Sequence, residues 1–150
     1  MENTDYHNIE LLIVEDNHAD AKLINRALIQ LKLPANKFFW VKDGEEALNF
    51  IFAKEQYSDR SVDDKPKIIL LDLKLPKIDG IDVLKQIRAD ERTCLVPVVI
   101  MTSSREEKDV IATYESGANS YIVKSVDFSK FMSSTRDLVL YWLFTNHPPE

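Results

Sequence analysis

Acidic, hydroxyl and basic residues follow several short apolar runs of this sequence. Glu15 and Asp16 follow the run LLIV, and Asp72 follows IILL. Thr102 follows VVIM, and Lys124 follows YIV. An ionised carboxylate at the end of an apolar run needs a partner, because removing its charge from water is costly. These five residues are therefore the first candidates for a chemically active site.

The residue types in this set favour one kind of chemistry. Crowded carboxylates raise one another's pKa unless a cation lies among them. Mg2+ prefers oxygen ligands and commonly combines one or two carboxylates with water and phosphate oxygens. A carboxylate nucleophile, a metal ion, a hydroxyl donor and a lysine are the components needed to transfer a phosphoryl group to an aspartate. The set therefore indicates a phosphoryl-transfer site.

The elements that must position these residues alternate between apolar runs and helical patterns. We expect strands at 11–14, 38–41, 67–73, 97–102 and 120–123. We expect helices at 19–31, 45–54, 81–89 and 105–116, and a last helix with Asp127 as its N-cap. The strand runs are apolar throughout, which is typical of a parallel α/β sheet covered by helices on both faces. Such sheets bind ligands at the carboxyl ends of their strands, where the candidate residues fall.

The composition is that of a soluble globular chain of 150 residues, with 45% hydrophobic and 29% charged residues. Its net charge of -6 argues against binding to nucleic acid or to acidic membranes. No apolar run approaches the roughly 18 residues that a membrane span requires. The single cysteine cannot form an internal disulfide, so we expect a reducing, cytoplasmic location. The three glycines are far apart, which excludes a glycine-rich phosphate loop.

Four sequence blocks together resemble the receiver domain of response regulators in two-component signalling. They are LLIVEDN, ILLDLKLPKIDG, VVIMTSS and YIVKS, and the resemblance covers about residues 9–140. The segment DGEEALNFIF, the long loop before the third strand and the YWLF ending resemble the phytochrome-associated receiver proteins of cyanobacteria. The resemblance implies a doubly wound, flavodoxin-like sheet of strand order 2-1-3-4-5. It also implies one receiver domain over residues 1–150, with the last helix reaching about residue 146.

The resemblance implies a metal site and a phosphoacceptor. Asp72 corresponds to the aspartate that accepts the phosphoryl group. Asp16 and Asp72 are expected to bind Mg2+ through their side chains, and Glu15 through a bound water. Lys74 is expected to offer its backbone carbonyl to the same ion, so its side chain is free to vary.

The resemblance also implies residues that bind the phosphoryl group and report its presence. Thr102 is expected to donate its hydroxyl to that group, and Lys124 to pair with it. Tyr121 matches an aromatic switch position, where burial of the ring follows movement of Thr102. The family usually has proline after the lysine, whereas Ser125 stands here. We therefore expect either a trans bond with an adjusted loop or a strained cis bond, since a cis bond before a non-proline residue costs about 2.5 to 4 kcal/mol.

The resemblance implies a stand-alone response regulator rather than a conventional enzyme. A sensor histidine kinase, of the cyanobacterial phytochrome type, would phosphorylate Asp72 in a light pathway. The output would be a change in protein-protein contacts. The last helix is apolar nearly all round at LVLYWLF, which favours a homodimer, although the helix could instead fold back over its own domain.

Two other functions remain open from the sequence. An aspartate-nucleophile phosphatase typically needs a second aspartate two residues after the nucleophile, but Lys74 occupies that position. A pseudo-receiver would keep the fold as a binding module without the chemistry, and the missing proline at Ser125 keeps that reading open.

Overall fold

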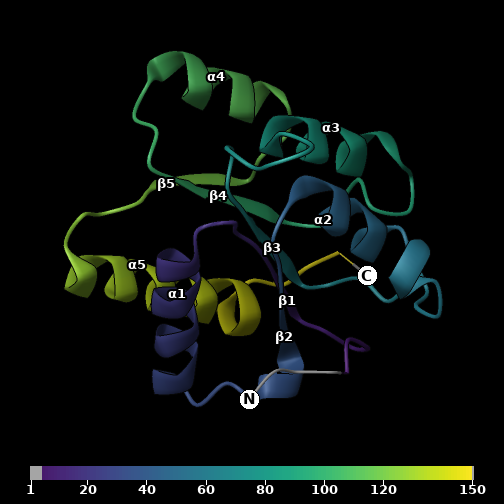
Figure 1. Cartoon of the computed structure of the whole chain (residues 1–150), viewed down its shortest axis with the longest axis horizontal. Coiled ribbons are helices and arrows are strands. Elements are labelled where there is room, and N and C mark those ends of the chain that lie inside the picture. The colour runs from purple at the N-terminus through teal and green to yellow at the C-terminus, as the bar shows by residue number, and fades with distance from the viewer. Residues whose placement is uncertain (1–4, 150) are drawn as a thin grey trace.

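Five parallel strands form one sheet in the order β2-β1-β3-β4-β5 in the computed structural model, which describes residues 5–149 (Figure 1). The strands are β1 (Leu11–Val14), β2 (Phe38–Val41), β3 (Ile68–Leu71), β4 (Val98–Thr102) and β5 (Ser120–Val123). Each strand lies within or matches the range expected from the sequence. The strand order confirms the predicted flavodoxin-like topology.

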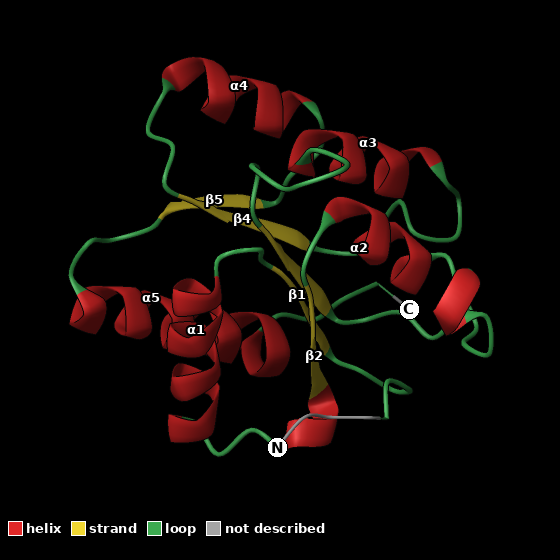
Figure 2. Cartoon of the chain, viewed as in Figure 1, coloured by secondary structure: helices red, strands yellow, loops and turns green. Residues whose placement is uncertain are grey.

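Helices cover both faces of the sheet, as Figure 2 shows by colour. Their bounds are α1 (His18–Gln30), α2 (Gly44–Ile51), α3 (Gly80–Ala89), α4 (Glu107–Glu115) and α5 (Phe128–Leu140). Helices α1 and α5 pack together on one face, while α2, α3 and α4 lie on the other (Figure 1). No helix within residues 5–149 is long and apolar enough to cross a membrane.

The two helical layers explain why the strands are apolar on both sides. Leu11 and Ile13 of β1 join the core beneath α1 and α5. Leu12 and Val14, the alternate residues of the same strand, join the core beneath α2 and α3. Successive side chains of a strand point to opposite faces, so a strand buried on both faces must be apolar at every position.

The C-terminal helical segment differs from a single regular α-helix. Asp127 caps α5 as predicted, accepting a hydrogen bond from the backbone N–H of Lys130 at 3.1 Å. After Leu140, the segment Tyr141–Thr145 continues as a π-helix, close to the predicted end near residue 146. Leu143 is buried within this wider turn.

The long loop before β3 is fixed by a buried arginine. Arg60 lies over the ring of Phe50, with its guanidinium carbon 3.9 Å from the ring centroid. It also donates hydrogen bonds to the backbone carbonyls of Phe50 and Asp64. The long loop before β3 therefore contains an internal anchor that holds it to the end of α2.

Candidate functional site

The register of the sheet brings the predicted residues to one edge. Val14 of β1 pairs with Leu71 of β3, so the next residues, Glu15 and Asp72, leave adjacent strands at the same level. The backbone N–H of Asp72 donates to the carbonyl of Val14 at 3.1 Å. The position of these two carboxylates therefore follows from strand pairing and not from the local sequence around either one.

Strands β4 and β5 supply Thr102 and Lys124 to the same edge. Thr102 pairs with Val123, and the backbone N–H of Lys124 donates to the carbonyl of Thr102 at 2.8 Å. Thr102 is buried, and the side chain of Lys124 is only 9% exposed. Lys124 therefore leaves β5 toward the carboxylates and not toward solvent.

The ammonium of Lys124 contacts three carboxylates at once. Its Nζ lies 2.7 Å from Asp72 Oδ2, 2.8 Å from Glu15 Oε1 and 2.8 Å from Asp20 Oδ2. Burial alone would lower the pKa of Lys124. Hydrogen bonds to Asp20, Asp72 and Glu15 outweigh burial and raise that pKa above its ordinary value. Lys124 is therefore a fixed positive charge beside the Asp72 carboxylate.

Three carboxylates at this edge are close enough together to be ligands of one metal ion. One oxygen each from Glu15, Asp16 and Asp72 lies within 4.8 Å of the others. Burial, and then the charge of Asp72, raise the pKa of Glu15 to about 7, although Lys124 acts in the opposite direction. A divalent cation would relieve this repulsion, and an all-oxygen set suits a hard divalent ion. The residues present therefore fit a divalent metal site.

The Asp72 carboxylate is held at both oxygens. Oδ2 contacts Lys124, and Oδ1 accepts a hydrogen bond from the backbone N–H of Lys74 at 3.3 Å. The side chain of Lys74 itself is exposed. Asp72 as a whole residue is 7% exposed, so only a small part of it is accessible to solvent.

A glycine allows α3 to begin against the backbone of Asp72. The N–H of Gly80 donates to the carbonyl of Leu73 at 2.8 Å. A Cβ atom at Gly80 would lie 2.2 Å from the carbonyl oxygen of Asp72 and 2.7 Å from Cα of Leu73. The DG pair at residues 79 and 80 therefore permits the close approach that keeps the loop after Asp72 in place.

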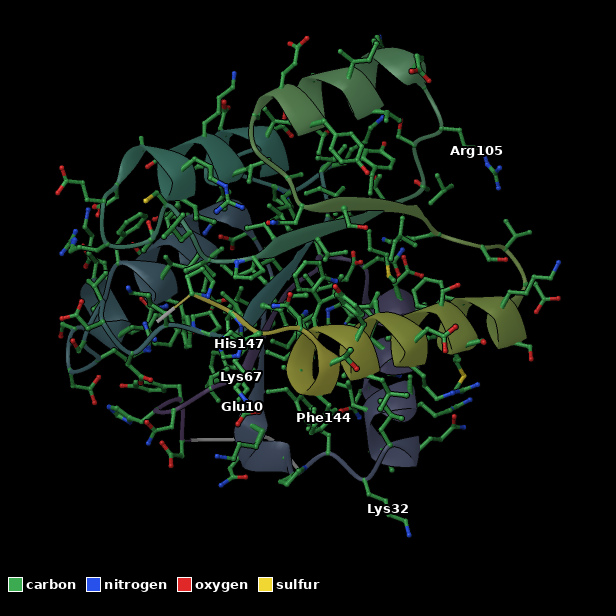
Figure 3. The ribbon with its side chains drawn as sticks, turned by 180° about the vertical axis from the view of Figure 1, so that it is seen from behind. Glu10, Lys32, Lys67, Arg105, Phe144 and His147 are labelled. Carbon is green, nitrogen blue, oxygen red and sulfur yellow. The ribbon has the colours of Figure 1, made fainter. Side chains whose placement is uncertain are left out.

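Ser104 connects the two predicted switch residues. Its backbone N–H donates to Oγ1 of Thr102 at 3.5 Å, and its carbonyl accepts from the hydroxyl of Tyr121 at 3.0 Å. The Oγ of Ser104 also donates to Asp109 of α4 at 2.5 Å. The neighbouring Arg105 points away from the sheet (Figure 3). Ser104 therefore contacts Thr102, Tyr121 and α4 at once.

Sequence reasoning missed one member of the site. Asp20 contacts Lys124 but was not among the predicted residues. It lies in the first turn of α1, and no motif in the sequence identified it. Lys42 and Asp43 follow β2, but Asp43 caps α2 by accepting from the N–H of Glu46 at 2.8 Å. They do not join the Lys124 cluster.

The sequence left open whether the peptide bond after Lys124 is trans or cis. The peptide bond between Lys124 and Ser125 is trans. Lys124 nevertheless reaches Asp72. The serine in place of the family's proline therefore does not turn the lysine away from the site.

This chain is similar in sequence to two regulatory proteins and similar in structure to one of them. The chain is 38% identical to the probable methanogenesis regulatory protein FilR2 of Methanothrix harundinacea, over 93% of this chain and 86% of that protein. It is 34% identical to response regulator Rcp1 of Synechocystis, over 90% of this chain and 89% of that one. A Mn2+-bound crystal structure of Rcp1 matches with a TM-score of 0.83, covering 93% of this chain and 98% of that one.

A phosphorylated relative is also similar in structure. The crystal structure of the phosphorylated cyanobacterial phytochrome response regulator RcpA matches with a TM-score of 0.86 and 36% identity. The match covers 93% of this chain and 97% of that one. Residues 11–136 match the family model for the response regulator receiver domain. This chain therefore belongs to the response regulator receiver family.

Proposed function

We propose that this chain is a response regulator that accepts a phosphoryl group on Asp72 from a sensor histidine kinase and signals by changing its protein-protein contacts. The observation that carries the proposal is the pairing of a buried carboxylate with a nearly buried ammonium, 2.7 Å between Asp72 Oδ2 and Lys124 Nζ. Membership of the response regulator receiver family supports a phosphoryl-transfer role for this pair. The chain then acts as one receiver domain.

The proposed reaction is a nucleophilic displacement at phosphorus. An oxygen of Asp72 bonds to the phosphorus of a phosphohistidine as the bond from phosphorus to the imidazole nitrogen breaks, and the electron pair leaves with that nitrogen. Lys124 and the N–H of Lys74 hold the carboxylate in one orientation before attack. Lys124 and Thr102 then stabilise oxygens of the transferred group by charge and by hydrogen bonding.

We assign the metal to Mg2+, held by Glu15, Asp16 and Asp72 with the backbone carbonyl of Lys74. The clustering of the three carboxylates within 4.8 Å supports this assignment. When bound, the ion supplies positive charge that neutralises phosphoryl oxygens. Glu15 and Asp72 are buried while Asp16 is exposed, so the ion would be approached from the Asp16 side.

The proposed output begins at Thr102. Binding of its hydroxyl to a phosphoryl oxygen would disturb the hydrogen bond from the N–H of Ser104. Tyr121 donates to the carbonyl of the same serine, so the ring would be released or repositioned together with the loop. The surface formed by α4 and β5 would change as a result, and a partner could detect that change.

A light-sensing kinase is the partner class that we favour. The similarity to Rcp1 and to the phytochrome response regulator RcpA supports a cyanobacterial phytochrome as phosphodonor. Phosphotransfer from a purified phytochrome kinase to Asp72 should then depend on illumination. The similarity to FilR2 makes a different sensor the competing outcome, which light-independent transfer from a non-phytochrome kinase would reveal.

The chemistry can be tested with a small phosphodonor. The chain is incubated with Mg2+ and acetyl phosphate, and its intact mass is followed over time. We expect one phosphoryl adduct that is absent in Asp72→Asn. A chain that forms no adduct with acetyl phosphate or with any histidine kinase would instead be a pseudo-receiver. Turnover of a phosphoester substrate would indicate the phosphatase, which the exposed Lys74 at the position of its second aspartate argues against.

We also propose that the chain forms a homodimer through its C-terminal helical segment. Leu140, Tyr141 and Phe144 are 43%, 49% and 66% exposed, which leaves an apolar surface at the end of α5. Phe144 is labelled in Figure 3. Sedimentation of the wild type should show a dimer at micromolar concentration, and Phe144→Glu should shift it to the monomer. A wild type that is monomeric with and without phosphorylation would remove the homodimer from the proposal.

A cytoplasmic location completes the proposal. It is supported by the single cysteine, Cys94, whose thiol has no second cysteine to pair with. The net charge of -6 supports protein partners rather than nucleic acid or an acidic membrane.

A further inference from the structure

The Lys124 ammonium has three N–H donors, and each has a carboxylate acceptor within 2.8 Å. Two of the acceptors, Glu15 and Asp72, also belong to the proposed metal site. The third, Asp20, is outside that set and contacts the site through Lys124 alone among the described side chains. Asp20 can therefore affect the site only through its hydrogen bond with Lys124.

Asp20 is attached to a rigid part of the fold. It is the third residue of α1, and its backbone N–H donates to the Oδ1 of the N-cap residue Asn17 at 3.0 Å. A carboxylate in the first turn of a helix is favoured by the helix dipole. Its side chain is 24% exposed, compared with 9% for Asp72, so it lies at the rim of the site.

Lys124, in contrast, lies where its own strand has ended. Of the two residues that follow it, Ser125 is half-buried and Val126 is 97% exposed. Ser125 accepts a local hydrogen bond from the N–H of Asp127 at 3.1 Å, which fixes the turn but not the lysine side chain. A lysine side chain has four rotatable bonds and loses considerable rotamer freedom when it is held in one position. Its carboxylate partners must supply that restraint.

Resting on the proposed function, we infer that Asp20 is a positioning residue that holds the Lys124 ammonium against Asp72 and thereby speeds phosphoryl transfer. When a phosphoryl group is on Asp72, Lys124 must turn one N–H to a phosphoryl oxygen. Asp20 and Glu15 can keep the other two N–H groups, so the ammonium stays in place throughout the reaction. Asp20 itself touches neither Asp72 nor the transferred group in this role.

The test compares Asp20→Ala and Asp20→Asn with a matched control, Asp82→Ala. Asp82 is also the third residue of its helix, α3, and is exposed. The loss of a charge-assisted hydrogen bond predicts that Asp20→Ala slows adduct formation with acetyl phosphate by about tenfold. Asp20→Asn, which keeps an oxygen acceptor, should fall between Asp20→Ala and the wild type. Asp82→Ala should react at the wild-type rate.

A second readout does not depend on phosphorylation. In metal-free protein labelled with 15N-lysine, the ammonium protons of Lys124 should exchange slowly with water and give an NMR cross-peak, identified by its absence in Lys124→Arg. We expect Asp20→Ala to lose this peak and Asp82→Ala to keep it. An unchanged rate, a faster rate or an unchanged peak in Asp20→Ala overturns the inference. A wild type that forms no adduct at all overturns the proposed function instead.

Discussion

The ammonium of Lys124 lies 2.7 Å from Oδ2 of Asp72, although the two residues are 52 positions apart in the chain. Both side chains are 9% exposed, so the pair is nearly removed from water. Asp72 follows β3 and Lys124 follows β5, and β4 lies between these two strands in the sheet. It therefore depends on the whole carboxyl edge being assembled, and its loss should affect both stability and chemistry.

Removing the charge of Lys124 should destabilise the metal-free protein. Lys124→Met leaves Glu15 and Asp72 buried without their cation, and breaking a buried ion pair on one side costs about 3 kcal/mol or more. Urea unfolding without divalent ions measures the change in unfolding free energy. Lys108→Met is the matched control, because its pair with Glu106 is exposed and should have no measurable effect. Equal stability of the two variants would contradict this account of the cluster.

Divalent metal should stabilise the folded chain, and Asp16 should be needed for most of that effect. A ligand that binds only the folded state adds about 2.7 kcal/mol at a concentration one hundred times its Kd. Thermal unfolding with and without millimolar MgCl2 should show a higher Tm with metal in the wild type. Asp16→Asn should lose most of the increase, because it removes one of the three clustered carboxylates.

The control for the metal prediction is Asp137→Asn, which removes an exposed carboxylate from α5, outside the cluster. It should show the wild-type increase in Tm. An increase that is the same in Asp16→Asn as in the wild type would mean that the ion binds elsewhere.

The main part of this site could be predicted from the sequence because strand ends are a reliable guide to position. Apolar runs define the strands, and the carboxyl ends of parallel strands meet at one edge whatever their side chains are. Glu15, Asp72 and Lys124 each follow such a run, so their meeting required only the correct strand order. The residue types then indicated the chemistry.

Contacts that depend on how helices are placed on the sheet could not be predicted in the same way. Asp20 reaches Lys124 only because α1 packs beside the sheet with its first turn at the carboxyl edge. The π-helical turn after Leu140 and the anchor made by Arg60 also depend on local packing. Hydrophobic periodicity indicates which face of a helix is buried, but it does not specify where the ends of that helix lie.

A side chain at Gly80 should distort the loop that carries Asp72. Alanine in a helix is normally about 1 kcal/mol better than glycine, but here its Cβ would lie 2.2 Å from the Asp72 carbonyl oxygen. We expect Gly80→Ala to lower the unfolding free energy by about 2 kcal/mol and to slow adduct formation with acetyl phosphate. Urea unfolding and intact mass measure the two effects. Lys85→Ala, an exposed change in the same helix, should alter neither, and a Gly80→Ala protein as stable as the wild type would contradict the close approach.

Arg88 should be important for stability but not for phosphoryl transfer. It is half-buried at the end of α3, where Nε donates to the carbonyl of Gly117 at 2.8 Å and Nη1 to that of Val96 at 2.6 Å. Nη2 donates to Oδ1 of Asn119 at 2.9 Å, and that oxygen also accepts from the N–H of Val98. One guanidinium thus joins α3 to the beginnings of β4 and β5, at the edge of the sheet opposite the carboxylates.

Arg88→Lys keeps the positive charge but removes the planar guanidinium, whose N–H groups donate to several acceptors at once. Leaving two or more partly buried acceptors unsatisfied should lower the unfolding free energy by about 2 to 3 kcal/mol, measured by urea unfolding. The rate of adduct formation at a temperature where the variant is folded should equal that of the wild type. Arg26→Lys, an exposed change on α1, should leave both quantities unchanged. A slower rate in Arg88→Lys with unaltered stability would show that α3 transmits its position to Asp72, because the variant leaves every residue of the carboxyl edge in place.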